Sequence, residues 1–193
     1  MSRAREFDDQ VVVQRAMRLF WRKGYDTATL PELLRAMRIS RGSFYNAFGT
    51  KREVLIHALR LYMSTGMDGI LAPLGGEQAG RAEIEGTFAR ILDYIASPRG
   101  RQGCLIGNSM TDVAMRDAEL REILLQARKD TEDALARAYA RGQAAGTIPG
   151  RTDPGSAGRF LLNTISGLMV ACKTDAGPDE LRDIVRLALR ILD

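Results

Sequence analysis

The chain has 193 residues, of which 45% are hydrophobic and 27% are charged, a composition typical of a soluble, folded protein with room for a small domain and a larger one. No apolar run reaches the ~18 residues that span a membrane, and the first residues lack the apolar core of a signal peptide. Two distant cysteines and one histidine argue against a disulfide scaffold or a structural zinc site. We therefore expect a cytoplasmic protein with no membrane contact, no metal and no cofactor, whose basic excess (12 lysines and arginines against 6 acidic residues in residues 1–60) suits the phosphates of nucleic acid.

Two helices are predicted in the first 37 residues. The first runs from Asp8 to Lys23, where apolar residues recur at steps of three and four, and Gly24 ends it. The second begins at Thr29, which forms a capping box with Glu32. Its buried stripe consists of Leu30, Leu33, Leu34 and Met37.

A third short helix follows after a tight turn and is capped by Ser40. It runs from Arg41 to Phe48, and its spacing turns Phe44 and Phe48 inward. The same spacing leaves four residues on the outer side: Arg41, Ser43, Tyr45 and Asn46. Two short helices that pack on a longer one are the parts of a helix-turn-helix.

The rest of the chain is also predicted to be helical. A fourth helix, capped by Thr50 with Glu53, extends to about Met67, and the segment 72–80 is a loop. Further helices are expected at residues 81–96, 104–113, 118–145, 154–172 and 178–192. With no convincing strand, we predict an all-α fold made of a DNA-binding domain at residues 1–52 and a larger helical domain at residues 53–193.

Two runs in the first third, AMRLFWRKGYDTAT from Ala16 to Thr29 and ISRGSFYNAFGTK from Ile39 to Lys51, resemble the TetR family of transcription regulators. The match covers nearly every fixed position of the family pattern across roughly residues 7–60. The resemblance implies a homodimeric, sequence-specific DNA-binding protein and not an enzyme. It most often implies a repressor, although the residues leave an activator open.

The resemblance assigns DNA contacts to residues of the second and third helices and the turn after them. Arg41, Ser43 and Asn46 would reach base edges, since arginine suits guanine and asparagine suits adenine. Thr29, Tyr45 and Lys51 would contact phosphates, which fix the register of the protein on the duplex. The complete predicted set is Thr29, Ser40, Arg41, Gly42, Ser43, Tyr45, Asn46 and Lys51, where Ser40 acts as the cap and Gly42 lets the helix approach the groove. Ala47 departs from the family, which often has a phosphate-binding histidine there.

The family's second domain implies a small-molecule effector and a dimer that places two recognition helices ~34–36 Å apart on a near-palindromic operator. The last two helices carry apolar stripes that predict the dimer seam, although such stripes could also pack within one subunit. The predicted seam residues are Phe160, Leu162, Ile165, Gly167, Leu168, Ile184, Leu187 and Ile191.

The segment Gly103-Cys104-Leu105 resembles the Gly-Cys-Leu motif of a TetR subgroup, some members of which sense electrophiles through a cysteine. Cys104 would stand in the first turn of a helix, where the dipole favours the thiolate, and Arg99 and Arg101 would add to that effect. The alternative is that Cys104 is a small buried hydrophobic residue, as free cysteines usually are.

Two other classes of protein compete with a regulator. An enzyme would need a catalytic motif, and the chain shows no metalloprotease, nucleophile-elbow, phosphate-loop or dinucleotide fingerprint. An architectural DNA binder would show affinity that depends on salt but not on sequence. The short predicted recognition helix and the acidic-leaning second domain argue against the architectural class.

Overall fold

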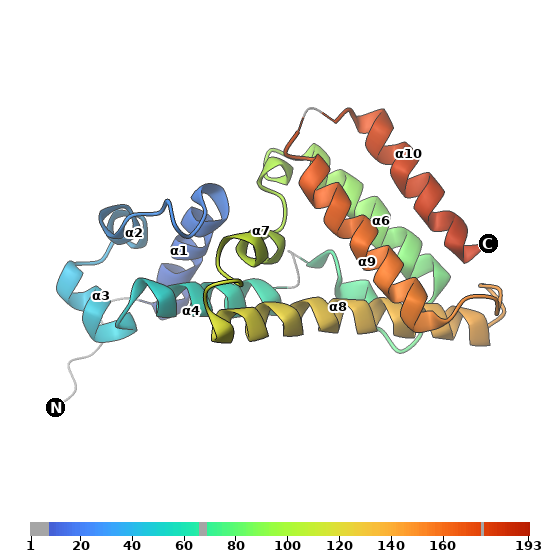
Figure 1. Cartoon of the computed structure of the whole chain (residues 1–193), viewed down its shortest axis with the longest axis horizontal. Coiled ribbons are helices and arrows are strands. Elements are labelled where there is room, and N and C mark those ends of the chain that lie inside the picture. Colours follow the sequence, from blue (N-terminus) through green and yellow to red (C-terminus); the bar gives the residue numbers. More distant parts are fainter. Residues whose placement is uncertain (1–7, 66–68, 175) are drawn as a thin grey trace.

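The computed structural model describes residues 8–65, 69–174 and 176–193 and contains helices but no strand in those ranges, which confirms the predicted all-α fold. Four helices form what we call the head: α1 (Asp9–Lys23), α2 (Leu30–Met37), α3 (Arg41–Phe48) and α4 (Lys51–Ser64). Five of the described helices form the body: α6 (Arg81–Ala96), α7 (Leu105–Asp112), α8 (Ala118–Ala144), α9 (Pro154–Ala171) and α10 (Pro178–Ala188). The head lies at one end of an elongated molecule and α10 lies at the other, with α8 running along the long axis (Figure 1).

Helix starts follow the predicted caps. Thr29 and Thr50 each form a complete capping box, in which the hydroxyl accepts from the backbone N–H three residues later and a glutamate carboxylate accepts from the cap's own N–H. Asp117 caps α8 by accepting from the N–H of Leu120. Because these signals are local, the observed helix starts lie within one residue of the predicted ones.

Helix ends differ more from the prediction. The fourth helix ends at Ser64, while the predicted end at Met67 lies outside the described residues. The segment 72–80 contains a short 3-10 turn, η1 (Ala72–Gly75), in which Leu74 is buried. A second turn, η2 (Gly100–Gln102), precedes α7, and the predicted last helix tightens into η3 (Leu189–Leu192). Such 3-10 turns are common at helix ends and connections.

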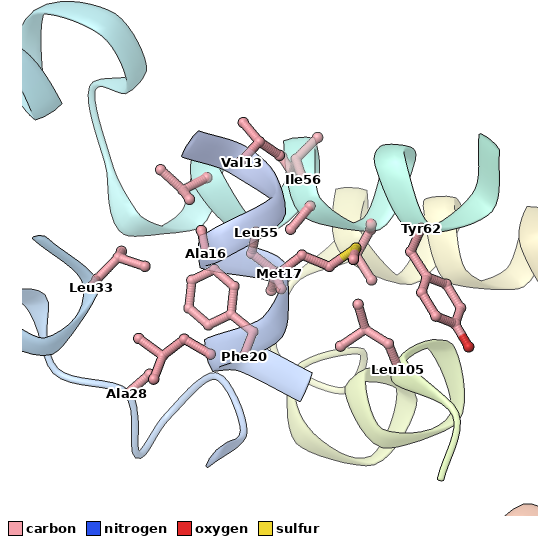
Figure 2. Packing of buried hydrophobic residues seen from close by; sticks show 14 of the residues in the cluster. Val13, Ala16, Met17, Phe20, Ala28, Leu33, Leu55, Ile56, Tyr62 and Leu105 are labelled. Atoms are coloured by element: carbon pink, nitrogen blue, oxygen red, sulfur yellow. The ribbon is translucent and has the colours of Figure 1, made fainter. Parts of the chain in front are cut away.

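The body supplies part of the head's hydrophobic core. Leu105 of α7 packs with Met17 of α1 and Tyr62 of α4 (Figure 2). Leu120 and Leu124, from the first turns of α8, belong to the same buried cluster. A second cluster fills the body and joins α6, α8, α9 and α10. The predicted boundary between residues 52 and 53 falls in the first turn of α4, whose apolar side chains lie in the head's core.

The turn between α2 and α3 has an unusual backbone. Arg38 has φ 60° and ψ 44°, which is left-handed helical geometry, and it is the only described non-glycine residue with positive φ. Its N–H is bonded to the carbonyls of Leu34 (2.9 Å) and Arg35 (3.3 Å), so it ends α2. This conformation costs roughly 1–2 kcal/mol for a residue with a Cβ.

Among the described residues, no helix is long and apolar enough to cross a membrane. Within the same ranges, no group of three or more histidine, cysteine, aspartate or glutamate side chains is placed to hold a metal ion.

Candidate nucleic-acid interface

Helix α3 presents a polar outer face over two buried rings. Phe44 and Phe48 are 0% and 7% exposed and anchor the helix in the head's core. Of the four predicted outer residues, Arg41, Tyr45 and Asn46 are exposed and Ser43 is half-buried. Gly42, on the same helix, is exposed as well. An eight-residue helix fixed by two phenylalanines can present its other side to a groove of a duplex.

The side chains on this face are partly held by one another. The Arg41 guanidinium lies 5.8 Å from the centroid of the Tyr45 ring, and that ring meets Phe44 edge-to-face at 5.4 Å. The Ser40 Oγ accepts from the Ser43 N–H at 3.1 Å and is 2.9 Å from the Ser43 Oγ. The stacking orders Arg41 and Tyr45, whereas the two serine hydroxyls are engaged in capping the helix.

Thr29 is placed at the start of α2, but its hydroxyl is occupied. It donates to Glu32 Oε2 at 2.9 Å, and Lys23 Nζ bonds the other oxygen of the same carboxylate at 2.5 Å. The hydrogen bond from Lys23 and those from Thr29 lower the pKa of Glu32 to about 2, so this carboxylate is charged at neutral pH. A phosphate contact by Thr29 therefore requires its hydroxyl to turn away from Glu32.

Lys51 is also engaged within the subunit. Its ammonium lies 4.4 Å from the centroid of the Tyr25 ring, a cation–π contact, and burial lowers its pKa from the ordinary value. The predicted DNA residues are thus gathered at the start of α2, along α3 and in the first turn of α4 (Figure 1). Arg41, Gly42, Tyr45 and Asn46 are exposed on α3, and the other four predicted residues have partners in the head.

The sequence prediction left out two exposed arginines that precede α3 in the chain. Arg35 lies in the last turn of α2 and Arg38 in the turn that follows it. With Arg41 they form a series at intervals of three, and residues 33–52 contain no acidic side chain. The basic series itself was the signal that could have identified both.

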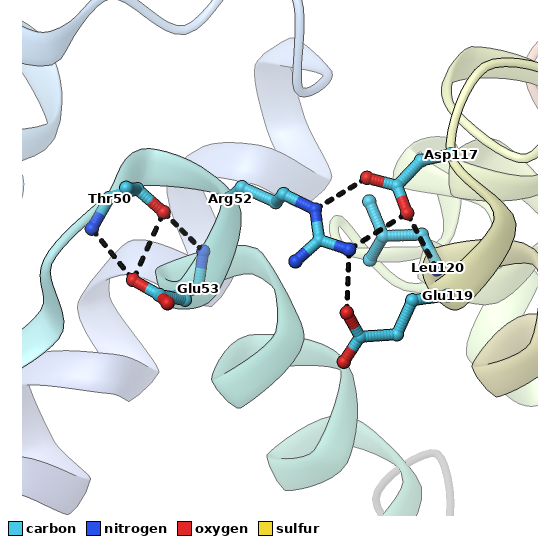
Figure 3. A network of polar contacts seen from close by, with 6 residues as sticks. All are labelled: Thr50, Arg52, Glu53, Asp117, Glu119 and Leu120. Atoms are coloured by element: carbon cyan, nitrogen blue, oxygen red, sulfur yellow. Dashed lines mark hydrogen bonds and ion pairs between the residues drawn. The ribbon is translucent and has the colours of Figure 1, made fainter.

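Ion pairs join the head to the start of α8. Arg52 Nε donates to Asp117 Oδ2 at 2.5 Å, and its Nη2 donates to Asp117 Oδ1 at 2.9 Å and to Glu119 Oε2 at 2.7 Å (Figure 3). Arg116 Nη2 pairs with Asp26 of the α1–α2 turn at 2.5 Å. The hydrogen bond from Arg52, followed by that from the Leu120 N–H, lowers the pKa of Asp117 to about 2.

A second contact between head and body centres on Gly103. Its carbonyl accepts from Trp21 Nε1 of α1 and from the Tyr94 hydroxyl of α6, both at 3.0 Å. Gly103 has φ 65° and ψ −147°, and a Cβ there would lie 2.7 Å from the Met169 carbonyl oxygen of α9. Only glycine suits this backbone and this approach. The Gly103 carbonyl therefore connects α1 and α6, while the Gly103 Cα lies close to α9.

Cys104 lies at the border of the two cores and packs against both. It is the N-cap of α7, one residue before the first turn in which we expected it, and its side chain is partly buried. The Tyr62 hydroxyl donates to Cys104 Sγ at 3.5 Å, and burial raises the pKa of Tyr62 well above its usual value. Cys172, by contrast, is buried, and burial raises the pKa of its thiol.

The predicted seam residues separate into two groups. Leu162, Ile165 and Leu168 are 7%, 5% and 1% exposed and pack in the body's own core, so they offer little surface to a second subunit. The others are accessible: Phe160, Gly167, Ile184 and Leu187 are exposed, and Ile191 is half-buried. Val170, which was not predicted, is 65% exposed on α9.

The comparisons with known proteins agree with this arrangement. The family model for bacterial regulatory proteins of the tetR family matches residues 12–59, and the model for the tetracyclin repressor-like C-terminal domain matches residues 80–188. The chain is 29% identical to YezE of Bacillus subtilis, an HTH-type transcriptional regulator, across the whole of both chains. It is 25% identical to the transcriptional repressor ComR of Escherichia coli, over 98% of this chain and 91% of that protein.

A solved structure supports the same assignment. A cysteine-substituted form of the TetR-family regulator CifR, in complex with a 26-base-pair double-strand operator DNA, matches 99% of this chain and 100% of its own with a TM-score of 0.85 and 28% identity. Together, the two family models cover most of this sequence. The chain therefore belongs to the TetR family and is a DNA-binding transcriptional regulator.

Proposed function

We propose that this protein is a cytoplasmic homodimeric repressor, which binds a near-palindromic operator through α3 of each subunit and leaves it when a small effector binds the body. The observation that carries the proposal is the exposed face of α3, with Arg41, Tyr45 and Asn46 held over two buried phenylalanines. CifR is bound to operator DNA in its complex, and ComR is named a repressor. No enzymatic reaction is assigned.

Base recognition is assigned to the centre of α3. Arg41 can donate two hydrogen bonds to O6 and N7 of guanine, and Asn46 can pair with adenine in the same groove. Ser43 can bond either type of base edge once its hydroxyl leaves Ser40. Gly42 has no side chain, and the nearest atom to a Cβ built there is the Ser40 Oγ at 3.9 Å, so its outer side is open for close approach to the duplex.

Phosphate contacts are assigned to Thr29, Tyr45 and Lys51. Tyr45 is 47% exposed, and its hydroxyl can donate to a phosphate oxygen. Thr29 and Lys51 exchange their partners within the subunit, Glu32 and the Tyr25 ring, for phosphates when the duplex binds. A phosphate that approaches the start of α2 also meets the partial positive charge of the helix N-terminus.

Dimerisation is assigned to the exposed apolar residues of α9 and α10. Phe160, Gly167 and Val170 share one side of α9, because intervals of seven and three residues return to similar angles on a helix. Ile184 and Leu187 form a similar stripe on α10. Large exposed apolar residues gathered on neighbouring helices are typical of an interface between subunits.

Effector action is assigned to the contacts between head and body. A ligand that binds one arrangement of the body more tightly shifts the spacing of the recognition helices, provided that the two parts move together. Gly103 and Arg52 connect α1 and α4 to the body and supply such a link. Electrophile sensing at Cys104 stays a prediction.

Genomic selection tests the regulator proposal. The purified protein is used to pull down sheared DNA from the genome that encodes it, and the retained fragments are sequenced. We expect one inverted repeat to be enriched, and its half-site spacing should be close to one helical turn or a multiple of it. The variant Arg41→Ala/Tyr45→Ala should lose this enrichment.

A matched control is Arg137→Ala, which removes an exposed arginine from α8 in the body. This variant should retain the same fragments as the unaltered protein. Retained fragments without a common site, or equal retention by the α3 variant, would favour the architectural class and contradict the proposal.

A further inference from the structure

Arg38 stands in a conformation that its side chain does not favour. Its φ of 60° belongs to the left-handed region, where glycine meets no steric penalty and residues with a Cβ do. The turn needs this geometry, because the Arg38 N–H closes α2 on the carbonyls of Leu34 and Arg35. A glycine would make the same two hydrogen bonds without the strain.

The Arg38 side chain has no bonding partner among the described residues of the subunit. It is exposed, and the described part of the chain gives its guanidinium no hydrogen bond and no ion pair. As the C-cap of α2, a cation here gains about 0.3–1 kcal/mol from the helix dipole, which does not offset the roughly 1–2 kcal/mol that the left-handed backbone costs. Residues that hold a strained backbone at a surface tend to be found where a ligand binds.

The surroundings of Arg38 favour an anionic partner. It is two residues before Ser40, the cap of α3, and three residues before Arg41, the first residue of that helix. Arg35, Arg38 and Arg41 are all exposed at intervals of three, and no acidic residue occurs from position 33 to position 52. The other two basic residues of that stretch, Lys51 and Arg52, are already engaged with Tyr25 and Asp117.

We infer that Arg38 binds a backbone phosphate of duplex DNA beside the groove that α3 enters. The inference rests on the proposed function, because it needs the duplex to approach α3. A turn residue at the end of α2 borders the recognition helix and does not lie on it, so its guanidinium meets the sugar-phosphate edge and not the bases. Arg38 thus adds affinity, salt sensitivity and register, but no preference for sequence.

Three substitutions separate charge from strain. Arg38→Gln keeps the strained backbone and removes the charge, Arg38→Lys keeps both, and Arg38→Gly removes both. Affinity is measured by fluorescence anisotropy on the operator fragment obtained by genomic selection and on a scrambled duplex of the same length, over a range of salt concentrations. Arg137→Gln on α8 is the matched control.

We expect Arg38→Gln to weaken binding about 3- to 10-fold at moderate salt on both duplexes, so that the ratio of the two affinities is kept. The slope of log K against log salt should fall by about 0.9 for each arginine removed. Arg38→Lys should retain more affinity than Arg38→Gln. Arg38→Gly should bind as weakly as Arg38→Gln, with a Tm that is unchanged or higher, which shows that the loss does not come from misfolding.

Wild-type affinity and salt slope in Arg38→Gln and Arg38→Gly would overturn this inference and leave the proposed function intact. A loss confined to the operator, with the scrambled duplex unaffected, would also overturn it, because it would mean that Arg38 reads bases. A wild-type protein that retains no DNA would overturn both the inference and the proposed function.

Discussion

Arg52 of α4 and Asp117 at the start of α8 are 65 residues apart in sequence and form a two-point ion pair, with Nε–Oδ2 at 2.5 Å and Nη2–Oδ1 at 2.9 Å. Asp117 uses the same carboxylate to cap α8, since its Oδ1 also accepts from the Leu120 N–H. One side chain therefore anchors the head and starts the longest described helix of the body (Figure 3).

Removal of this pair should destabilise the protein in a non-additive way. Arg52→Gln and Asp117→Asn should each lower the urea midpoint, and the double variant should lose less than the sum of the two, because both single changes break the same contact. Asparagine is a good N-cap, so Asp117→Asn isolates the ion pair from the cap. Arg60→Gln, an exposed arginine on the same helix, should leave the midpoint unchanged. Simple additivity would contradict a direct pair.

Stability should fall in acid because of Asp117. Its pKa is about 2 in the folded protein against an ordinary value of 3.8. The contribution of Asp117 to the free energy of unfolding is complete above pH 3.8 and is lost as the pH falls through about 2. In this range the carboxylate of the unfolded state takes up a proton at a higher pH than that of the folded state, so acid favours unfolding. Urea unfolding between pH 5 and pH 2 should therefore show a shallower decline for Asp117→Asn than for the wild type. The pKa of Glu32 is lowered in the same direction, so part of the decline stays in the variant. Parallel curves for the two proteins would refute the assignment.

A methyl group at Gly103 should be poorly tolerated. Gly103→Ala adds a Cβ 2.7 Å from the Met169 carbonyl oxygen and places it on a backbone with φ 65°. We expect a loss of about 1–3 kcal/mol in the free energy of unfolding from the backbone alone. Gly107→Ala is the control, since a Cβ there meets Cys104 at an ordinary 3.8 Å within α7. That change should raise stability by about 0.5–1 kcal/mol. Equal effects of the two changes would show that Gly103 is not constrained as described.

Phe160 provides a direct test of the proposed seam. Its ring is 46% exposed on α9, and an aspartate there would place a charge in an apolar interface. Phe160→Asp should weaken the dimer by about 2 kcal/mol or more if the ring is a central anchor, as measured by sedimentation velocity. Met115→Asp changes a residue that is 82% exposed outside the α9 and α10 stripes and should remain dimeric. A dimer that persists in Phe160→Asp, while Leu187→Asp dissociates, would move the seam to α10.

The two cysteines should differ in reactivity. Cys104 is partly buried, whereas Cys172 is buried with a raised thiol pKa. Iodoacetamide followed by mass spectrometry should therefore modify Cys104 first. Trp21 fluorescence should change at the same rate, because Trp21 packs edge-to-face on Tyr62 at 5.0 Å and the Tyr62 hydroxyl bonds Cys104. Cys104→Ser should abolish the fast phase, and a fast phase that survives would assign it to Cys172.

Helix positions could be predicted from the sequence because their signals are short-range. Thr29 with Glu32, and Thr50 with Glu53, lie three residues apart, and both capping boxes form as expected. The outer face of α3 could be predicted for the same reason, since Phe44 and Phe48 fix which side is buried. Local periodicity is sufficient for such elements.

Contacts between distant residues could not be predicted in this way. Trp21 and Gly103 are 82 residues apart, and nothing in either segment indicates that one donates to the other. Lys51 is predicted to contact a phosphate, and nothing in its own segment indicates that its ammonium lies 4.4 Å from the centroid of the Tyr25 ring. On α9, the apolar pattern could not distinguish Leu168, which packs inside the subunit, from Phe160, which faces outward. Periodicity identifies an apolar side, and tertiary packing decides which of its residues are covered.

The shared core has a consequence for how this regulator could be engineered or could diversify. Leu105, Leu120 and Leu124 fill the head from α7 and α8. A chimera that joined the whole head, through the end of α4 at Ser64, to an unrelated body would therefore leave vacant volume beneath α1 and α4. The head is therefore not a portable module. A change of operator preference is accessible through exposed residues of α3, whereas an exchange of the whole head requires matching changes in α7 and α8.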